Sequence, residues 1–299
     1  MLAIRCLGRK KMADTTVTVR QDGTGDYTTI TSAMAAADIS SGYYKIEIDD
    51  SNTYTETVSL SATGTGTIDN YLWITVSAGN RHSGVAANTG HARLVGSATY
   101  GFHVFDDYSR IEYLQINALA NRECIKINGR TGILVSRCLL LGPTTSDRAI
   151  YAISNDVSGQ SSTRDLYVDN CVISNTRDDG IRMAYQQIGL YVDHCTIADN
   201  DGSGIYQAGI ILFTDTSGST VNLYNNILVD VPTYSYKGST LAGSSSGTTN
   251  ITDSGSHNIY DESVANTNNN GSITDWVQAT SISDTTSGAT VISVNETNL

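Results

Sequence analysis

The side chains that could do chemistry stand in four of five similar four-residue segments, each between two apolar residues, and the fifth segment has isoleucine at that position. If the segments stack as parallel strands, these middle residues form one outward column with neighbours about 4.8 Å apart. Arginine and lysine pair with carboxylates, and a sugar ring can lie on an aromatic face, so the column predicts a site for an acidic sugar. The segments are GFHV, CIKI, AIYA, GIRM and GIIL, with His103, Lys126, Tyr151, Arg182 and Ile211 in the third position.

The column would suit a polysaccharide lyase. In that reaction Arg182 or Lys126 would neutralise the carboxylate of a uronic acid. Tyr151 or His103 would then abstract the proton at C5. A second interpretation is a binding groove without catalysis, and the simplest is a solvated outer face, on which mixed polar residues are expected.

Carboxylates in the preceding turns provide another catalytic hypothesis. Asp178 and Asp179 would serve as acid and base in glycoside hydrolysis. Adjacent residues of a strand point to opposite faces, which weakens the case for this pair. The carboxylates concerned are Glu123, Asp147, Asp178 and Asp179.

We predict no cofactor and no metal. The stretch DNDG, residues 199–202, begins like a calcium-binding loop but lacks a glutamate at the twelfth place. A turn is therefore the better interpretation, and Ca²⁺ is a weak alternative. His82, His91 and His194 do not have the spacing of metal ligands.

A duplicated segment indicates how these residues are positioned. LYVDNCVI, residues 166–173, recurs as LYVDHCTI, residues 190–197, and looser copies occur at 111–116, 133–141 and 221–228. Repetition at a fixed period of about 24 residues is typical of a solenoid. The alternation of apolar residues in each copy predicts two short strands that meet at a bend around Asp169 and Asn170.

Aligning the copies predicts columns of inward side chains and a right-handed parallel β-helix, in which each coil carries at least two strands. The first strands align Val135, Val168, Val192 and Leu223, followed by Cys138, Cys171, Cys195 and Asn226. The later strands align Phe102, Ile125, Ile150, Ile181 and Ile210, followed by Val104, Ile127, Ala152, Met183 and Leu212.

The N-terminal part predicts a cap for this stack. In DGTGDYTTITSAMAAAD, residues 22–38, Thr31 or Ser32 would cap a short helix whose apolar face includes Met34 and Ile39. With the strand pattern that follows, residues 15–60 resemble the N-terminal cap of the pectate-lyase-like right-handed β-helix superfamily. That superfamily includes pectin esterases, polygalacturonases, polysaccharide lyases and many phage proteins, and the looser coil pattern extends the resemblance to about residue 230.

The catalytic motifs of those families are incomplete in this chain. NTRDDG, residues 175–180, is similar to motifs of polygalacturonases, but Arg177 interrupts it. The GHG motif is absent, because Ala92 follows Gly90 and His91, and neither RIK nor the esterase motif DFIFG occurs. The resemblance therefore implies a fold and does not imply an activity.

Charge and cysteine content narrow the range of partners. The net charge is −12, and outside four basic residues among the first 12 the chain carries 14 basic against 30 acidic side chains. An acidic protein surface of this kind repels the phosphates of a nucleic acid, which argues against such a partner. No apolar stretch is long enough to span a membrane. Three of the 5 cysteines share one inward position. We therefore expect buried thiols, and folding in a reducing cytoplasm.

These observations predict a structural or adhesive β-helix, a bacteriophage virion component of the tail, spike or capsid surface that presents a carbohydrate-facing surface. Its partners would be a polysaccharide or cell-surface glycan, other virion proteins and further copies in a homotrimer. The alternative is an extracellular polysaccharide lyase or glycoside hydrolase acting on an acidic polysaccharide. The expected regions are a basic leader (1–14), a cap (15–60), a β-helix body (61–235) and a ragged last coil with a cap or contact segment (236–299).

Overall fold

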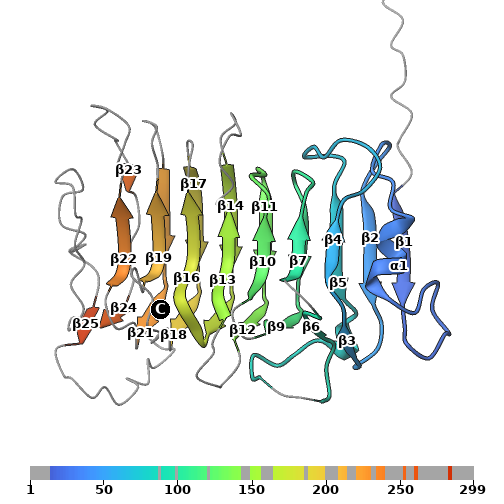
Figure 1. The fold of residues 1–299 in the computed structure, drawn as a ribbon, viewed down its shortest axis with the longest axis horizontal. Helices are drawn as coiled ribbons and strands as arrows, with labels where there is room; N and C mark the ends of the chain where they lie inside the picture. Colours follow the sequence, from blue (N-terminus) through green and yellow to red (C-terminus); the bar gives the residue numbers. More distant parts are fainter. Residues whose placement is uncertain are drawn as a thin grey trace, which may run out of the picture.

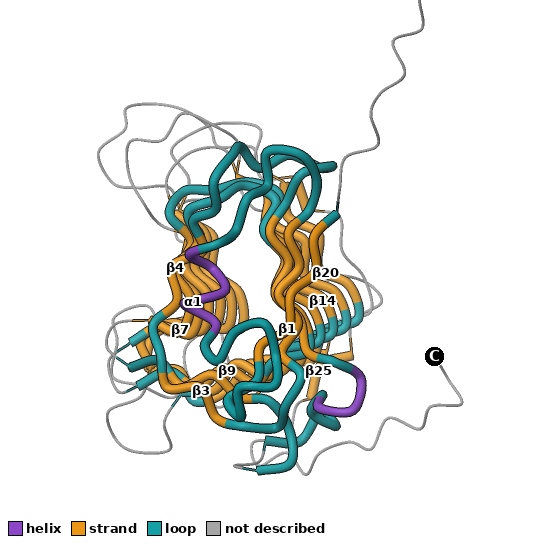
Figure 2. The backbone as a smooth tube through the Cα atoms, turned by 90° about the vertical axis from the view of Figure 1, so that its right-hand side faces the viewer, coloured by secondary structure: helices purple, strands orange, loops and turns teal. Residues whose placement is uncertain are grey.

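A computed structural model describes most of the chain from residue 14 onward. The described residues are 14–86, 89–97, 100–119, 122–142, 149–155, 164–184, 188–198, 208–213, 220–229, 234–239, 252–253, 259–261 and 282–284. They form three sheets of parallel strands around a common axis, and successive coils stack along this axis (Figures 1 and 2). No helix among the described residues is long and apolar enough to cross a bilayer.

Each full coil contributes one strand to each sheet, in the order sheet 1, sheet 3, sheet 2. Sheet 1 contains β1 (Thr15–Val19), β2 (Tyr44–Ile48), β5 (Leu72–Val76), β8 (Arg110–Glu112), β11 (Ile133–Ser136), β14 (Arg164–Asp169), β17 (Ile188–Asp193), β20 (Thr220–Tyr224) and β23 (Thr252–Asp253). Sheet 2 contains β4 (Val58–Leu60), β7 (Tyr100–Val104), β10 (Glu123–Ile127), β13 (Ala149–Asn155), β16 (Thr176–Ala184), β19 (Ala208–Phe213) and β22 (Tyr234–Ser239). Sheet 3 contains β3 (Thr53–Thr55), β6 (Arg93–Val95), β9 (Gln115–Asn117), β12 (Leu139–Leu141), β15 (Val172–Ser174), β18 (Thr196–Ala198), β21 (Ile227–Val229), β24 (Ile259–Asp261) and β25 (Ile282–Asp284).

This architecture confirms the predicted all-β right-handed parallel β-helix. The boundaries proposed for its regions stay a prediction. Residues 1–13, which hold the basic leader, and Trp276 in the last region lie outside the described residues.

In five successive coils, one residue turns the chain from sheet 1 into sheet 3. These corner residues have a positive φ between 51° and 63°, although none is glycine. The backbone amide of the corner residue still hydrogen-bonds to the next coil. Arg137 N donates to Asp169 O at 2.8 Å, and Asn170 N donates to Asp193 O at 3.0 Å. The predicted bend at Asp169 and Asn170 is therefore confirmed. The corner residues are Tyr113, Arg137, Asn170, His194 and Asn225.

The core contains the predicted inward columns of sheet 1, whereas in sheet 2 the predicted columns fail at β13, where Asn155 rather than Ala152 pairs with Ile127. In sheet 1, Val135 pairs with Val168, Val168 with Val192 and Val192 with Leu223. All four side chains are buried. Apolar contact between successive coils thus runs without interruption along this side of the axis.

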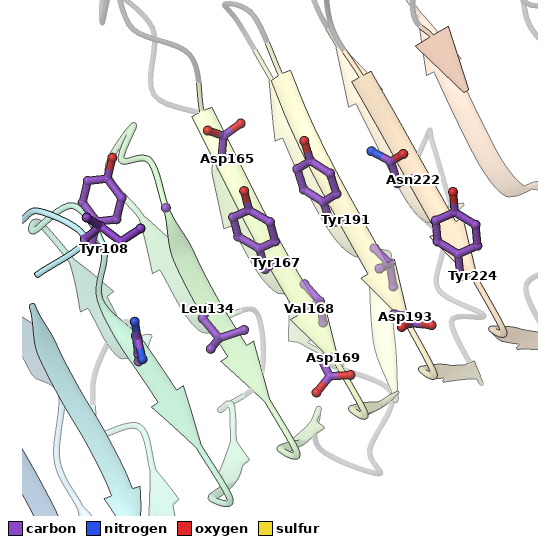
Figure 3. A pocket seen from close by; sticks show the side chains of 14 residues that line it. Tyr108, Leu134, Asp165, Tyr167, Val168, Asp169, Tyr191, Asp193, Asn222 and Tyr224 are labelled. Atoms are coloured by element: carbon purple, nitrogen blue, oxygen red, sulfur yellow. The ribbon is translucent and has the colours of Figure 1, made fainter. Parts of the chain in front are cut away.

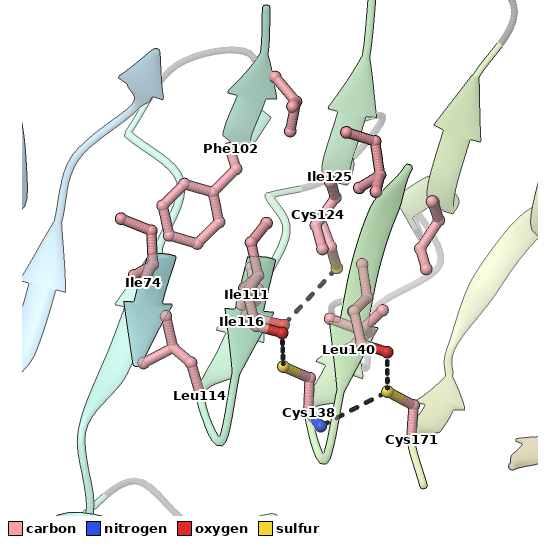
Figure 4. Close-up of a cluster of buried hydrophobic side chains, with 14 of the residues drawn as sticks. Ile74, Phe102, Ile111, Leu114, Ile116, Cys124, Ile125, Cys138, Leu140 and Cys171 are labelled. Carbon is pink, nitrogen blue, oxygen red and sulfur yellow. Dashed lines mark hydrogen bonds between the residues drawn. The ribbon is translucent and has the colours of Figure 1, made fainter. Parts of the chain in front are cut away.

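The cysteine column is also confirmed, and part of it is drawn in Figure 4. Cys138 N donates to Cys171 Sγ at 3.5 Å, and Cys171 N donates to Cys195 Sγ at 3.4 Å. Asn226 completes the column, because its Oδ1 accepts from Cys195 N at 2.9 Å. Burial raises the pKa of the Cys171 thiol, so it stays protonated as a small apolar group.

The register of β13 differs from the prediction. Ile125 pairs with Ile153 rather than with Ile150, and Ile153 pairs with Ile181 after an irregularity near Ala149. The observed register also places Ser154 where its hydroxyl donates to the buried Glu123 carboxylate at 2.7 Å. The prediction failed because this segment has apolar residues at both odd and even positions along the strand. Periodicity alone therefore does not choose between the two registers.

The short helix α1 (Ile30–Ala35) covers one end of the stack (Figure 2). Its N-cap is Thr29, not Thr31 or Ser32 as predicted, and the Thr29 hydroxyl accepts from Ser32 N at 3.0 Å. Met34 is buried as predicted, whereas Ile39 is buried beyond the end of the helix. The helix begins earlier because Ile30 is itself part of the core.

Truncating one buried side chain of sheet 1 should destabilise the whole stack. We expect Leu166→Ala to lower the free energy of unfolding by about 2–5 kcal/mol, because Leu166 is fully buried between Ile133 and Leu190. Urea unfolding followed by circular dichroism measures the change. The control is Val85→Ala, which alters a side chain that is 68% exposed and should change stability by less than about 0.5 kcal/mol. Equal effects of the two substitutions would contradict the assignment of the core.

Candidate functional site

The predicted column on sheet 2 exists, with one member replaced. His103 pairs with Lys126, Lys126 with Ser154, and Ser154 with Arg182. Tyr151 belongs three residues earlier, where it pairs with Asp179, because of the shifted register of β13. We call His103, Lys126, Ser154 and Arg182 the basic stripe. Ile211 follows Arg182 in the same column, as predicted.

Both cations of the stripe have a carboxylate three residues earlier. Lys126 Nζ lies 3.7 Å from Glu123 Oε1, and Arg182 Nη1 lies 3.6 Å from Asp179 Oδ2. The guanidinium of Arg182 also lies 4.9 Å from the centre of the Tyr151 ring, so these two predicted residues do meet. The paired charges cancel, and the stripe therefore presents little net positive charge to an acidic ligand.

The described carboxylates of the predicted catalytic set are buried. Asp179 is fully buried, and Glu123 is 7% exposed and bound to Ser154. Asp147 and the side chain of Asp178 lie outside the described residues. The geometry of the described carboxylates is that of ion pairs within strands, which fits a structural role.

A different surface is hollowed and exposed. Sheet 1 carries a groove of about 950 Å³ on its outer face, drawn in Figure 3. Tyr167 and Tyr191 lie at its centre with ring centroids 4.6 Å apart and planes inclined by 9°. Tyr167 and Tyr224 are 38% and 37% exposed. We call this surface the tyrosine groove. It is lined by Ile68, Tyr108, Arg110, Gly132, Leu134, Asp165, Tyr167, Val168, Asp169, Tyr191, Val192, Asp193, Asn222 and Tyr224.

The register of sheet 1 creates this groove. Leu134 pairs with Tyr167, Tyr167 with Tyr191, and Tyr191 with Asn222, so one outward column crosses four coils. The next outward column places Asp169 opposite Asp193 and Asp193 opposite Tyr224. Aromatic rings therefore lie beside hydrogen-bonding groups along the direction of the helix axis.

Two glycines leave room for the walls of the groove. Gly132 has φ +69°, and a Cβ there would collide with the ring of Tyr108. A Cβ at Gly189 would overlap the carboxylate of Asp165. Glycine is required at position 132, where φ is positive, whereas a side chain at position 189 would displace the Asp165 carboxylate.

The aspartates of the groove are hydrogen-bonded without cationic partners. Asp169 Oδ2 accepts from Ser136 Oγ at 2.9 Å, and Asp193 Oδ1 accepts from Asn225 Nδ2 at 3.2 Å. Asp165 Oδ2 accepts from Thr131 Oγ1 at 3.3 Å. Among the described residues, no lysine or arginine forms an ion pair with any of the three. No direct lysine or arginine ion pair of the described residues therefore neutralises these three carboxylates.

One group in the described part of the chain could hold a metal ion. Ligand atoms of Asp169, Asp193 and His194 lie within 4.8 Å of one another, and His194 Nδ1 is 2.8 Å from Asp193 Oδ1. Hydrogen bonds to Ser136 and Asn225 account for the carboxylates without a metal. The sequence analysis missed this group because Asp169 and His194 belong to successive coils. The DNDG stretch lies outside the described residues.

The tyrosine groove was also missed by the sequence analysis. Tyr167 and Tyr191 occupy the same position of the duplicated LYVD segment, and this duplication was used only to infer the fold. An outward aromatic residue repeated in register is the signal that could have revealed the surface. Tyr224 was harder to place, since it stands one outward column away from the other two.

No protein-family model matches the sequence, and no curated protein matches it either. Among solved structures, the pectin methylesterase from carrot is 14% identical with a TM-score of 0.44, over 82% of this chain and 71% of that one. The pectin methylesterase from Aspergillus niger is 14% identical with a TM-score of 0.41, over 80% of this chain and 85% of that one. Likeness at this level of sequence identity does not extend to an activity.

The basic stripe should make stability depend on pH through His103. Its pKa is lowered from 6.5, first by burial and then by the nearby charge of Lys126. The folded state therefore binds fewer protons than the unfolded chain, and the free energy of unfolding should fall as the pH drops below 6.5. Urea midpoints between about pH 7.5 and about pH 5 measure this slope.

His103→Gln isolates this contribution, because His82 also has a pKa lowered by burial and adds to the slope of the wild type. The variant should lose part of the decline below pH 6.5 and keep the plateau above it. An unchanged slope would show that His103 titrates as freely in the folded protein as in the unfolded chain.

Proposed function

We propose that this protein is a polysaccharide-binding β-helix and that the glycan lies in the tyrosine groove. The observation that carries the proposal is the pair of parallel rings, Tyr167 and Tyr191, in an open groove with aspartates on both sides. A sugar ring has apolar C–H faces and polar hydroxyl edges. The groove offers both complements, since aromatic surface meets C–H groups and carboxylates accept hydrogen bonds from hydroxyls.

The groove is a better binding surface than the basic stripe. The cations of the stripe are compensated by Glu123 and Asp179, and Ser154 between them is fully buried. In the groove the rings of Tyr167 and Tyr224 are more than one-third exposed. A ligand would gain more by covering exposed aromatic surface than by displacing ion pairs that already exist.

Matched tyrosine substitutions on the two surfaces test the proposal. Tyr167→Ala should weaken binding to a glycan by roughly three- to tenfold, the loss expected for one aromatic contact. Tyr151→Ala, the same substitution on sheet 2, should leave affinity unchanged. Affinity would be measured by calorimetry or on a glycan array. A loss of binding with Tyr151→Ala alone would favour the basic stripe and contradict the proposal.

A polysaccharide lyase at the basic stripe is the second candidate. Its supporting observation is the contact between Arg182 and Tyr151, which brings a cation and a phenol together. We expect no turnover, because Arg182 already pairs with the buried Asp179. Incubation with alginate and pectate, followed by absorbance of new C=C bonds and assay of reducing ends, tests this. Turnover that disappears in Arg182→Ala would establish the lyase.

The setting in which such a surface is displayed is a separate part of the proposal. A long, narrow stack with a glycan-binding side suits an adhesive component of a bacteriophage tail, spike or capsid surface, as a monomer or a homotrimer. An extracellular setting is the alternative. Mass spectrometry of purified virions would detect the chain in the first case, and its absence from particles would favour the second.

A further inference from the structure

We propose that the tyrosine groove selects uncharged glycan chains and rejects acidic ones. This inference rests on the proposed function and names its ligand class. It differs from the acidic polysaccharide that the sequence predicted, because the relevant surface is another one. The observation that supports it is the negative charge of the aspartates that line the groove.

Among the described residues that line the groove, four are charged, and three of these are aspartates. Asp165, Asp169 and Asp193 stand on β14 and β17, the two strands that carry the paired rings of Tyr167 and Tyr191. Their described hydrogen-bond partners are hydroxyl, amide and imidazole groups, and the guanidinium of Arg137 meets Asp169 only indirectly, through Ser136 Oγ. A uronate or sulfate bound over these rings would face like charges within a few ångströms.

Arg110, the one cation among the described lining residues, is placed away from the rings of Tyr167 and Tyr191. Arg110 stands two strands before Tyr167 in the same outward column, roughly 10 Å along the axis. Its guanidinium lies 3.8 Å from the centre of the Tyr71 ring, and this contact holds it against the earlier coils. Arg110 therefore does not neutralise the aspartates at the centre of the groove.

Uncharged sugars match the hydrogen-bonding character of the same walls. An ionised carboxylate only accepts hydrogen bonds, and a sugar hydroxyl can donate one. Such bonds to a charged acceptor are stronger than bonds between neutral groups. The column from Leu134 to Asn222 crosses four coils, roughly 14 Å, so several sugar units of one chain can contact it.

A second copy of this chain is a less suitable occupant. A symmetric contact through this groove would bring its three aspartates toward those of the partner, and only Arg110 could offset them. Light scattering tests this occupant directly. A dimer or trimer that dissociates in Tyr167→Ala would overturn the proposal.

The main experiment uses polymers that differ only in charge. Galactan, mannan and β-glucan are immobilised, each beside a derivative whose C6 alcohols have been oxidised to carboxylates. We expect the wild type to bind at least one parent polymer in a way that requires Tyr167, and to bind its oxidised derivative at least tenfold more weakly. Added salt should reduce this difference, since it screens the aspartates.

The variant Asp169→Asn/Asp193→Asn tests the cause of the selectivity. Asparagine keeps the shape and an acceptor oxygen while it removes the charge. The difference between parent and oxidised polymer should shrink on the order of fivefold per aspartate at low salt. Leu119→Ala, at a 39% exposed side chain outside the groove lining, is the control and should leave the difference unchanged.

The outcomes separate the two proposals. Tyr167-dependent binding that favours the oxidised polymers would overturn the selectivity and leave the proposed function intact. The same holds if the double asparagine variant discriminates as strongly as the wild type. Lack of any Tyr167-dependent binding across the panel would overturn the proposed function itself.

Discussion

Hydrogen bonding between successive coils determines where every side chain of this protein lies. Parallel pairing places equivalent residues one strand spacing apart, so each position along a strand becomes a column. Because side chains alternate along a strand, burial of the Val168 column places the Tyr167 column outside. A slip by one residue would exchange them, and the energy of burying the valine column prevents it. The outer surface is thus set by the requirements of the core.

The sequence was most informative where two copies of a segment were nearly identical. The LYVD segments predicted the strands, the corner at Asn170 and the stacked cysteines, because one consistent alternation allowed only one register. In β13, Ile150, Ala152 and Ile153 supply apolar side chains at positions of both parities. A partner one coil away, the buried Glu123, helps to fix that register, and no single segment contains this information.

The candidate site was harder to predict than the fold for a related reason. Sequence alone counts charges but does not show how they are paired. Lys126 and Arg182 looked like a cationic surface, whereas each lies beside a carboxylate that the strand geometry buries. Asp169 and Asp193 looked like turn residues, whereas stacking brings them together without a lysine or arginine among the described residues. Whether a charged side chain is compensated depends on the residues of its own and the neighbouring coils.

The direction of the tyrosine groove has a mechanical consequence. Its columns run from coil to coil, at right angles to the strands. A solenoid holds together only through contacts between adjacent repeats, so an axial load is carried by one interface after another. A polymer bound across four coils would contact several of these interfaces at once and hold the coils together. Occupancy would then stiffen the middle of the rod against bending and against the local fraying by which repeat proteins begin to come apart.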